Sequence, residues 1–208
     1  MAVKNIILDL GGVLLNLDYD LMAKNLADLG ILDVFSKQKQ TGFMDDWEEG
    51  KFNQVHFLSE LKKLGNLTEP DSEQKIKEAW NSILLDFPKE RLELLQILQS
   101  KYRLFLYSNT NEIHIESFES SLQTVHQVDG LHSFFEKVYY SNVLGIRKPK
   151  TEGFLHILNE NNLLAEETIF IDDSPQHIVG AKNAGITSFY LDLQTQNIHS
   201  LLTDLKLI

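Results

Sequence analysis

The sequence predicts an α/β fold in which helices cover both faces of a parallel sheet. Five short apolar runs have the length of strands, and several are apolar at nearly every position, as expected for strands that are buried on both faces. Helical patterns separate the last four runs, and this alternation favours parallel βαβ units. The long stretch between the first two runs shows helical periodicity and no convincing strand. We therefore expect a doubly wound sheet with one helical insert.

The five predicted strands are short, apolar and bounded by polar residues. They are VKNIILDL (3–10), RLFLYS (103–108), KVYYS (137–141), TIFID (168–172) and ITSFYLD (186–192).

Three helices are predicted between these strands. KERLELLQILQ (89–99) follows Pro88 and places Leu92, Leu95 and either Leu98 or Ile97 on one face. TEGFLHILNENN (151–162) and SPQHIVGAKNAG (174–185) follow the next two strands. In the last helix, Ser174 is a candidate N-cap, Pro175 suits the first helical position and Gly185 is a candidate stop.

The insert runs from Asp18 to Phe87, and its clearest helical pieces are QVHFLSELKKLG (54–65) and DSEQKIKEAWNSIL (71–84). We therefore expect one core made of residues 1–17 and 88–208, and one helical unit made of residues 18–87. The insert must leave and rejoin the core beside the end of the first strand, close to Asp9.

Composition restricts the possible functions. The formal net charge is −11, which argues against binding to nucleic acid or to anionic membranes. There is no cysteine, so disulfides and thiolate chemistry are excluded. The first apolar run is broken by Asp9 and lacks a basic leader, and no run has the length of a membrane span. We expect a cytoplasmic, soluble protein.

Polar residues follow four of the predicted strands. In open α/β sheets, ligands bind at the carboxyl ends of the strands, so these residues are the candidates for a site. They are Asp9, Ser108, Asn109, Lys148, Asp172 and Asp173.

This set of side chains favours phosphate chemistry. Three carboxylates at one sheet edge repel one another, and a divalent cation would relieve that repulsion. Oxygen ligands point to Mg²⁺, which shares its remaining positions with water and phosphate. Ser108 and the backbone of Asn109 can donate to phosphate oxygens, and Lys148 adds positive charge. A carboxylate can also act as a nucleophile through an aspartyl-phosphate.

Four motifs in order resemble those of the haloacid dehalogenase-like (HAD) hydrolases, and the resemblance covers almost the whole chain. They are ILDLGGVL, LYSNTNE, GIRKP and FIDDSPQHIVGAKNAGI. The resemblance implies a Rossmann-like core with a C1-type helical cap. Within the family, the sequence is most similar to glucose-1-phosphatase-like phosphatases and to the N-terminal phosphatase domain of epoxide hydrolases.

The resemblance also implies roles for individual residues. Asp9 would be the nucleophile, and Asp9, the Gly11 carbonyl and Asp173 would bind Mg²⁺ with support from Asp172. The phosphate-binding residues would be Gly11, Gly12, Ser108, Asn109 and Lys148.

Two positions depart from the family pattern. Most phosphatases of this family carry a second aspartate, a general acid/base, two residues after the nucleophile, where this chain has Gly11. Many relatives have an acid where this chain has His177. A proton for the leaving group must then come from water, from the cap or from the substrate.

Other residues have a structural interpretation that we favour. His56, His114 and His177 show no ligand spacing, and we interpret them as surface or packing residues. For Asp45, Trp47 and Glu48 we favour a packing tryptophan with solvated acids. The alternative for these three residues is a cap surface that faces the substrate.

We expect a Mg²⁺-dependent phosphatase that acts on a small phosphorylated metabolite, such as a sugar phosphate, as a monomer or homodimer. Two alternatives remain open: a haloacid dehalogenase, whose chemistry needs no Mg²⁺, and a non-catalytic phosphate- or partner-binding protein, which the glycine at position 11 makes plausible.

Overall fold

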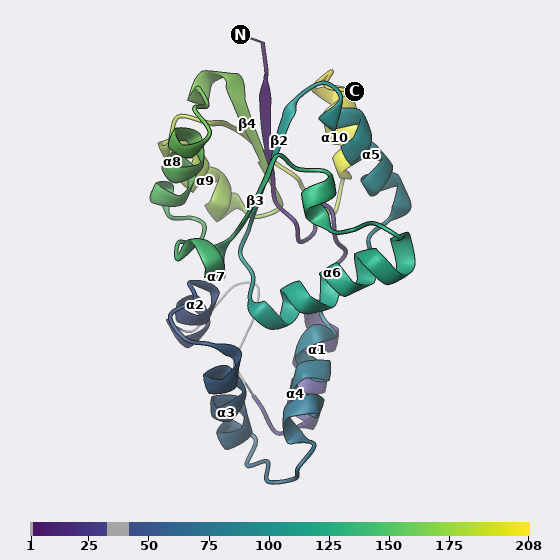
Figure 1. Cartoon of the computed structure of the whole chain (residues 1–208), viewed down its shortest axis with the longest axis vertical. Coiled ribbons are helices and arrows are strands. Elements are labelled where there is room, and N and C mark those ends of the chain that lie inside the picture. Colours follow the sequence, from purple (N-terminus) through teal and green to yellow (C-terminus); the bar gives the residue numbers. More distant parts are fainter. Residues whose placement is uncertain (1, 33–41) are drawn as a thin grey trace.

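The centre of the fold is a five-stranded sheet in the order β3-β2-β1-β4-β5, in which all neighbouring strands are parallel. The computed structural model describes residues 2–32 and 42–208 (Figure 1). The parallel sheet predicted from the sequence is confirmed. The strands are β1 (Asn5–Leu8), β2 (Arg103–Ser108), β3 (Lys137–Tyr140), β4 (Thr168–Asp172) and β5 (Thr187–Tyr190).

Alternate residues of the central strand face two separate apolar layers. Ile6 and Leu8 belong to a cluster of buried apolar side chains. The other side of this cluster comes from helices α5 (Lys89–Gln99), α6 (Glu112–His126) and α10 (Ile198–Asp204). Ile7 faces the opposite side, where α8 (Thr151–Glu160) and α9 (Pro175–Asn183) pack. Burial on both faces explains why β1 is apolar at successive positions. The core is therefore a three-layer α/β/α structure, as the sequence predicts.

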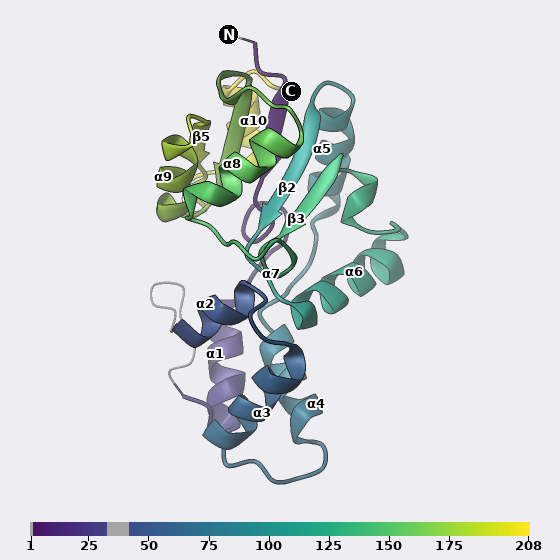
Figure 2. The same cartoon turned by 60° about the vertical axis from the view of Figure 1, so that its left-hand side comes forward.

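In the described part of the chain, four helices between β1 and α5 share an apolar cluster, to which α6 adds only Ile113. This cluster contains Met22, Trp47, Phe57 and Trp80. The helices are α1 (Tyr19–Asp28), α2 (Gly42–Glu48), α3 (Gln54–Leu64) and α4 (Ser72–Asn81). We call this helical insert the cap and the rest of the chain the core. Both views place the cap at one end of the core, below the carboxyl ends of the strands (Figures 1 and 2).

Two strands, β2 and β4, have the predicted limits, whereas β1, β3 and β5 are shorter at their ends than predicted. In the helix at 175–183, Pro175 is at the first position and Gly185 has φ +83°, but the N-cap Ser174 makes no capping hydrogen bond. On α5, Leu92, Leu95 and Leu98 are buried, whereas Ile97 is exposed. The short helix α7 (Ser141–Leu144) was not predicted.

Within the described residues, no helix is both long and apolar enough to span a bilayer.

Candidate active site

Several of the predicted polar residues meet at one edge of the sheet because their strands are parallel. Asp9 directly follows β1, and its backbone N–H donates to the carbonyl of Ile171 in β4 at 3.0 Å. Ser108 is the last residue of β2, and Asp172 is the last residue of β4. Asp9, Ser108 and Asp172 are all buried. The edge is therefore a concentration of polar groups in a poorly solvated place, which a protein does not build for stability.

Lys148 lies between the two buried carboxylates. Its ammonium donates to Asp9 Oδ1 and to Asp172 Oδ2, each at 2.6 Å. The side chain is 0% exposed and passes close to the rings of Tyr107 and Phe170. A buried charge needs such partners, because an unpaired ammonium in this position would cost several kcal/mol. Lys148 therefore fixes the relative positions of the two carboxylates.

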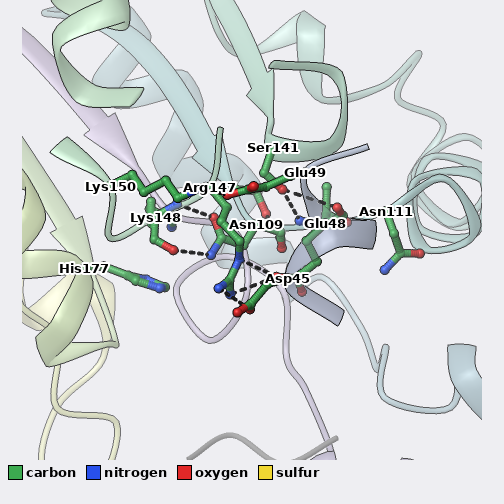
Figure 3. A network of polar contacts seen from close by, with 12 residues as sticks. Asp45, Glu48, Glu49, Asn109, Asn111, Ser141, Arg147, Lys148, Lys150 and His177 are labelled. Atoms are coloured by element: carbon green, nitrogen blue, oxygen red, sulfur yellow. Dashed lines mark hydrogen bonds and ion pairs between the residues drawn. The ribbon is translucent and has the colours of Figure 1, made fainter. Parts of the chain in front are cut away.

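Asn109 holds the backbone of Lys148 rather than pointing away from it. The Asn109 side-chain amide donates to the Lys148 carbonyl at 2.9 Å, and its oxygen accepts from the Lys148 N–H at 2.8 Å (Figure 3). These two bonds join the end of β2 to the loop that carries the lysine. The side chain of Asn109 thus has a positioning task that the sequence did not indicate.

The charges at this edge do not balance within the described residues. Burial and the repulsion of Asp172 and Asp173 raise the pKa of Asp9 to about 8, although Lys148 lowers it. Burial would also raise the pKa of Asp172, but Lys148 and His177 outweigh it and hold that pKa at about 2. Asp9, Asp172 and Asp173 thus bring three carboxylates to a poorly solvated edge where Lys148 bonds to two of them. The residues present therefore fit a divalent cation with oxygen ligands.

Asp173 approaches the site from the side of the glycine loop. Gly12 has φ +75°, and a Cβ at Gly12 would lie 2.6 Å from Asp173 Oδ2. Only glycine suits both the backbone angle and the close approach of this carboxylate. The second glycine of the sequence motif therefore makes room for Asp173.

His177 belongs to the site, which corrects its interpretation as a surface or packing residue. Its Nδ1 lies 3.0 Å and 2.9 Å from the two oxygens of Asp172. Burial and Lys148 lower the pKa of His177, while Asp172 raises it. Among the described residues, Asp9, Asp172 and His177 offer possible ligand atoms within 4.8 Å of one another. Asp173 is not in that group. The only feature of the sequence that pointed to His177 was its position, where many relatives have an acid.

A small cavity of about 70 Å³ opens beside the site, between the core and the cap. Gly11, Ser108 and Asn109 line its core side, and Tyr19, Glu48 and Trp80 line its cap side. Most of its remaining lining is apolar. The cavity therefore adjoins the residues at the end of β2 and the glycine loop on the core side.

The two acids singled out in the segment at 45–48 differ: the Asp45 side chain is 42% exposed, as expected for a solvated acid, whereas Glu48 is buried, which corrects the favoured interpretation for Glu48. Trp47 is indeed a packing residue, 1% exposed and stacked on Phe57. Glu48, however, is buried and accepts a hydrogen bond from Arg147 of the core at 2.9 Å. Asp45 accepts from the same guanidinium at 2.5 Å. Sequence reasoning missed Arg147, although it directly precedes Lys148.

The chain belongs to the haloacid dehalogenase-like hydrolases. The model of that family matches residues 3–185, which include the sheet edge, the cap and the loop of Lys148. The protein is therefore an enzyme of the hydrolase class, and the resemblance seen in the four motifs is confirmed.

Individual relatives are similar over nearly the whole chain. A D-ribitol-5-phosphate phosphatase from Bacteroides thetaiotaomicron is 30% identical over 191 residues, which are 90% of this chain and 91% of the relative. A HAD family enzyme from the same organism, solved with magnesium and inorganic phosphate, is 29% identical with a TM-score of 0.83. That match covers 96% of this chain and 99% of the other.

A third relative is a predicted HAD-like hydrolase from Porphyromonas gingivalis. It is 30% identical, has a TM-score of 0.87, and the match covers 99% of this chain and 98% of the other. The cap and the core of this chain thus have counterparts in solved structures.

Proposed function

We propose that this protein is a Mg²⁺-dependent phosphatase that hydrolyses a small phosphorylated metabolite, of the sugar or polyol phosphate class, through an aspartyl-phosphate on Asp9. The observation that carries this proposal is the buried ammonium of Lys148, held 2.6 Å from both Asp9 and Asp172 at the carboxyl ends of the strands. The names of the relatives support the substrate class, because one of them acts on D-ribitol 5-phosphate.

In this mechanism the Asp9 carboxylate attacks phosphorus. A bond forms between Asp9 and phosphorus while the ester P–O bond breaks, and the electron pair leaves with the alcohol oxygen. Lys148, Ser108 and the backbone of Asn109 hold the phosphate oxygens and offset their charge. Water then attacks the phosphorus of the acyl phosphate, which restores the Asp9 carboxylate and releases inorganic phosphate.

The residues that would hold Mg²⁺ are Asp9, Asp173 and the Gly11 carbonyl, with Asp172 behind them. When bound, the ion would neutralise negative charge on the carboxylates and on the phosphate. Lys148 and His177 both contact the carboxylate of Asp172. Asp172 would therefore act by keeping Lys148 and Asp9 in place.

The alcohol leaving group needs a proton that Gly11 cannot provide. Within the cavity, the cap carboxylate of Glu48 lies on the opposite side from Gly11. Water, this cap acid or a hydroxyl of the substrate would supply the proton. The small volume of the cavity, about 70 Å³, favours a small leaving group.

We also propose the division into a core of residues 1–17 and 88–208 and a cap of residues 18–87. The apolar cluster of the cap helices, to which the core contributes Ile113 alone among the buried residues described, supports this division. Residues 33–41 of the cap lie outside the described residues.

The test is release of inorganic phosphate from a panel of sugar and polyol phosphates, with Mg²⁺ and with EDTA. We expect turnover only with Mg²⁺, and we expect Asp9→Asn to lower kcat at least a thousandfold while circular dichroism and Tm show an intact fold. Asparagine keeps the shape of Asp9 but cannot form the acyl phosphate. Turnover of Asp9→Asn near the wild-type rate would contradict the nucleophile, and halide release without Mg²⁺ would favour a dehalogenase.

A further inference from the structure

Arg147 joins the cap to the core through ion pairs with two acids of α2. Its Nη1 donates to Asp45 Oδ1 at 2.5 Å, and its Nε donates to Glu48 Oε2 at 2.9 Å (Figure 3). The side chains of Arg147 and Glu48 are only 14% and 11% exposed, whereas that of Asp45 is 42% exposed, so the buried pair is the one with Glu48. A buried ion pair of this kind contributes little net stability, but removing one partner leaves the other charge buried and alone. The arrangement is therefore sensitive to whether the cap is in place.

Two further contacts bring α2 against the same region of the core. Lys150 donates to Glu49, whose side chain is 4% exposed. Gly50, which follows α2, lies so close to α7 that an added Cβ would be 2.0 Å from the carbonyl oxygen of Asn142. The acidic end of α2 is thus docked on the core by charge and by close backbone approach.

The docked loop is the one that carries the lysine of the site. Arg147 directly precedes Lys148, and Lys150 follows two residues later. The backbone of Lys148 is held on both its N–H and its carbonyl by Asn109. A change in the position of Arg147 must therefore reach both Lys148 and Asn109.

We propose that Arg147 is a positioning residue that places Lys148 and Asn109 for phosphate only while the acids of α2 are docked on it. This inference rests on the proposed function, because it takes Lys148 and Asn109 as phosphate-binding groups. The cap then does more than enclose the substrate: through Asp45 and Glu48 it completes the phosphate site in the core. An undocked cap leaves Lys148 on a loop whose Arg147 has lost its bonds to Asp45 and Glu48.

The first experiment compares Arg147→Gln and Arg147→Lys with a matched control, Arg103→Gln. Arg103 also makes a two-bond ion pair with a glutamate, Glu136, but at the opposite end of β2 and with both side chains more than 40% exposed. We expect Arg147→Gln to weaken binding of inorganic phosphate with Mg²⁺, measured by calorimetry, roughly tenfold or more, and to lower kcat by a similar factor. Arg147→Lys should regain part of both losses, and Arg103→Gln should leave both values unchanged.

The second experiment measures docking itself. The chain has no cysteine, so Val55→Cys on α3 and Val179→Cys on α9, at positions 71% and 57% exposed, give one label on the cap and one on the core. We expect Arg147→Gln to lengthen and broaden the distance distribution between the labels. Gly50→Ala should do the same through the clash with Asn142. Gly30→Ala is its control, because Gly30 has a similar φ of +76° but no contact closer than 3.5 Å.

The outcomes separate this inference from the proposed function. If Arg147→Gln keeps the wild-type distance distribution and the wild-type phosphate affinity, the inference is wrong, even if Tm falls, because the residue then only stabilises the fold. If wild-type protein binds phosphate but releases none from any substrate, the proposed function fails. The label distances and phosphate affinities still decide the role of Arg147 in that case.

Discussion

Gly11 lies two residues after Asp9, in a place that has room for a side chain. An added Cβ would approach only Leu17, with its Cδ1 at 2.6 Å. Because that carbon ends a flexible side chain, a small rearrangement of Leu17 would accommodate a larger residue. Gly11 also lines the cavity that would hold the leaving group. An acid at position 11 would therefore face the bond that breaks.

We predict that Gly11→Asp helps alkyl phosphates more than aryl phosphates. A sugar alkoxide leaves poorly and gains from a proton donor, whereas p-nitrophenolate needs little protonation. Well-placed general acids contribute on the order of a hundredfold, and an added one is expected to give about tenfold or less. The quantity to measure is the ratio of kcat/KM for the alkyl and aryl substrates, because crowding and added negative charge affect both alike. An unchanged ratio would mean that the proton already comes from elsewhere, such as Glu48.

Asp172 and Asp173 are neighbours in sequence but differ in their surroundings. Asp172 is fully buried, bonded to Lys148 and His177, and its Oδ1 also accepts from the Ser174 N–H at 2.7 Å. Asp173 is partly exposed and packs against Gly12. Both oxygens of Asp172 therefore bond to other groups of the protein. Of the two residues, we assign Asp173 as the direct ligand of the Mg²⁺ ion.

We predict that Asp173→Asn weakens Mg²⁺ binding more than Asp172→Asn does. Loss of a direct ligand removes a metal–oxygen contact, whereas loss of a supporting group typically costs about 10- to 100-fold in affinity. A Mg²⁺ titration of phosphate release, with Tm measured for each variant, decides the order. The reverse order would assign Asp172 to the ion, in line with its place in the group with Asp9 and His177.

At the scale of elements, α4 of the cap and α6 of the core meet through Trp80 and His114. The two rings are stacked with centroids 5.2 Å apart. His114 Nε2 lies 3.2 Å from the Trp80 carbonyl, and Nδ1 lies 3.0 Å from the amide of Asn111. The carbonyl can only accept and the amide nitrogen can only donate, so the ring is neutral with its proton on Nε2. Burial lowers the pKa of His114 to about 4, although the bond to Trp80 raises it.

We predict that this contact makes the protein less stable as pH falls from about 6.5 to 4. In that window the unfolded chain binds a proton at His114 that the folded chain does not, so the free energy of unfolding falls with pH by up to about 3 kcal/mol. Unfolding by urea at several pH values measures it. His114→Gln should remove this part of the slope, and His132→Gln, on an exposed side chain, should not. Equal slopes in wild type and His114→Gln would contradict the buried neutral ring.

Local patterns in the sequence were sufficient to predict where the strands lie and which polar residues are at their ends. β2 and β4 were predicted to the residue because each is an unbroken apolar run with a clear polar boundary. The short helix α7 was missed, since a single turn after a strand has no periodicity to detect.

Long-range partners could not be predicted. Arg147 meets Glu48 across 99 positions, and no local pattern specifies such a pair. His177 was interpreted as packing because its partner, the buried carboxylate Asp172, is known only once α9 is placed against β4. Buried charge partners thus depend on the tertiary structure, whereas the residues that end strands do not.

At the scale of the whole molecule, the site is made by elements distant in sequence. β1 and its loop supply Asp9 and the glycines, β2 supplies Ser108, and β4 supplies Asp172. The cap, inserted between β1 and β2, closes the cavity opposite Gly11. Because the cap is attached at the first strand end, its position and the geometry around Asp9 are coupled through the connecting segments, which pair at Leu17 and Leu84.

The position of β1 has a consequence for how the chain folds. β1 is synthesised before both of its neighbours, β2 and β4. Their residues pair with it from 98 and 163 positions away, as for Asn5 with Arg103 and Thr168. Such non-local pairing slows folding, because the chain must close long loops before the pairs form. During translation β1 therefore has neither partner until β2 has left the ribosome, and one of its two edges stays unpaired until β4 follows. That interval exposes the nascent chain to aggregation and makes it a candidate for chaperone binding.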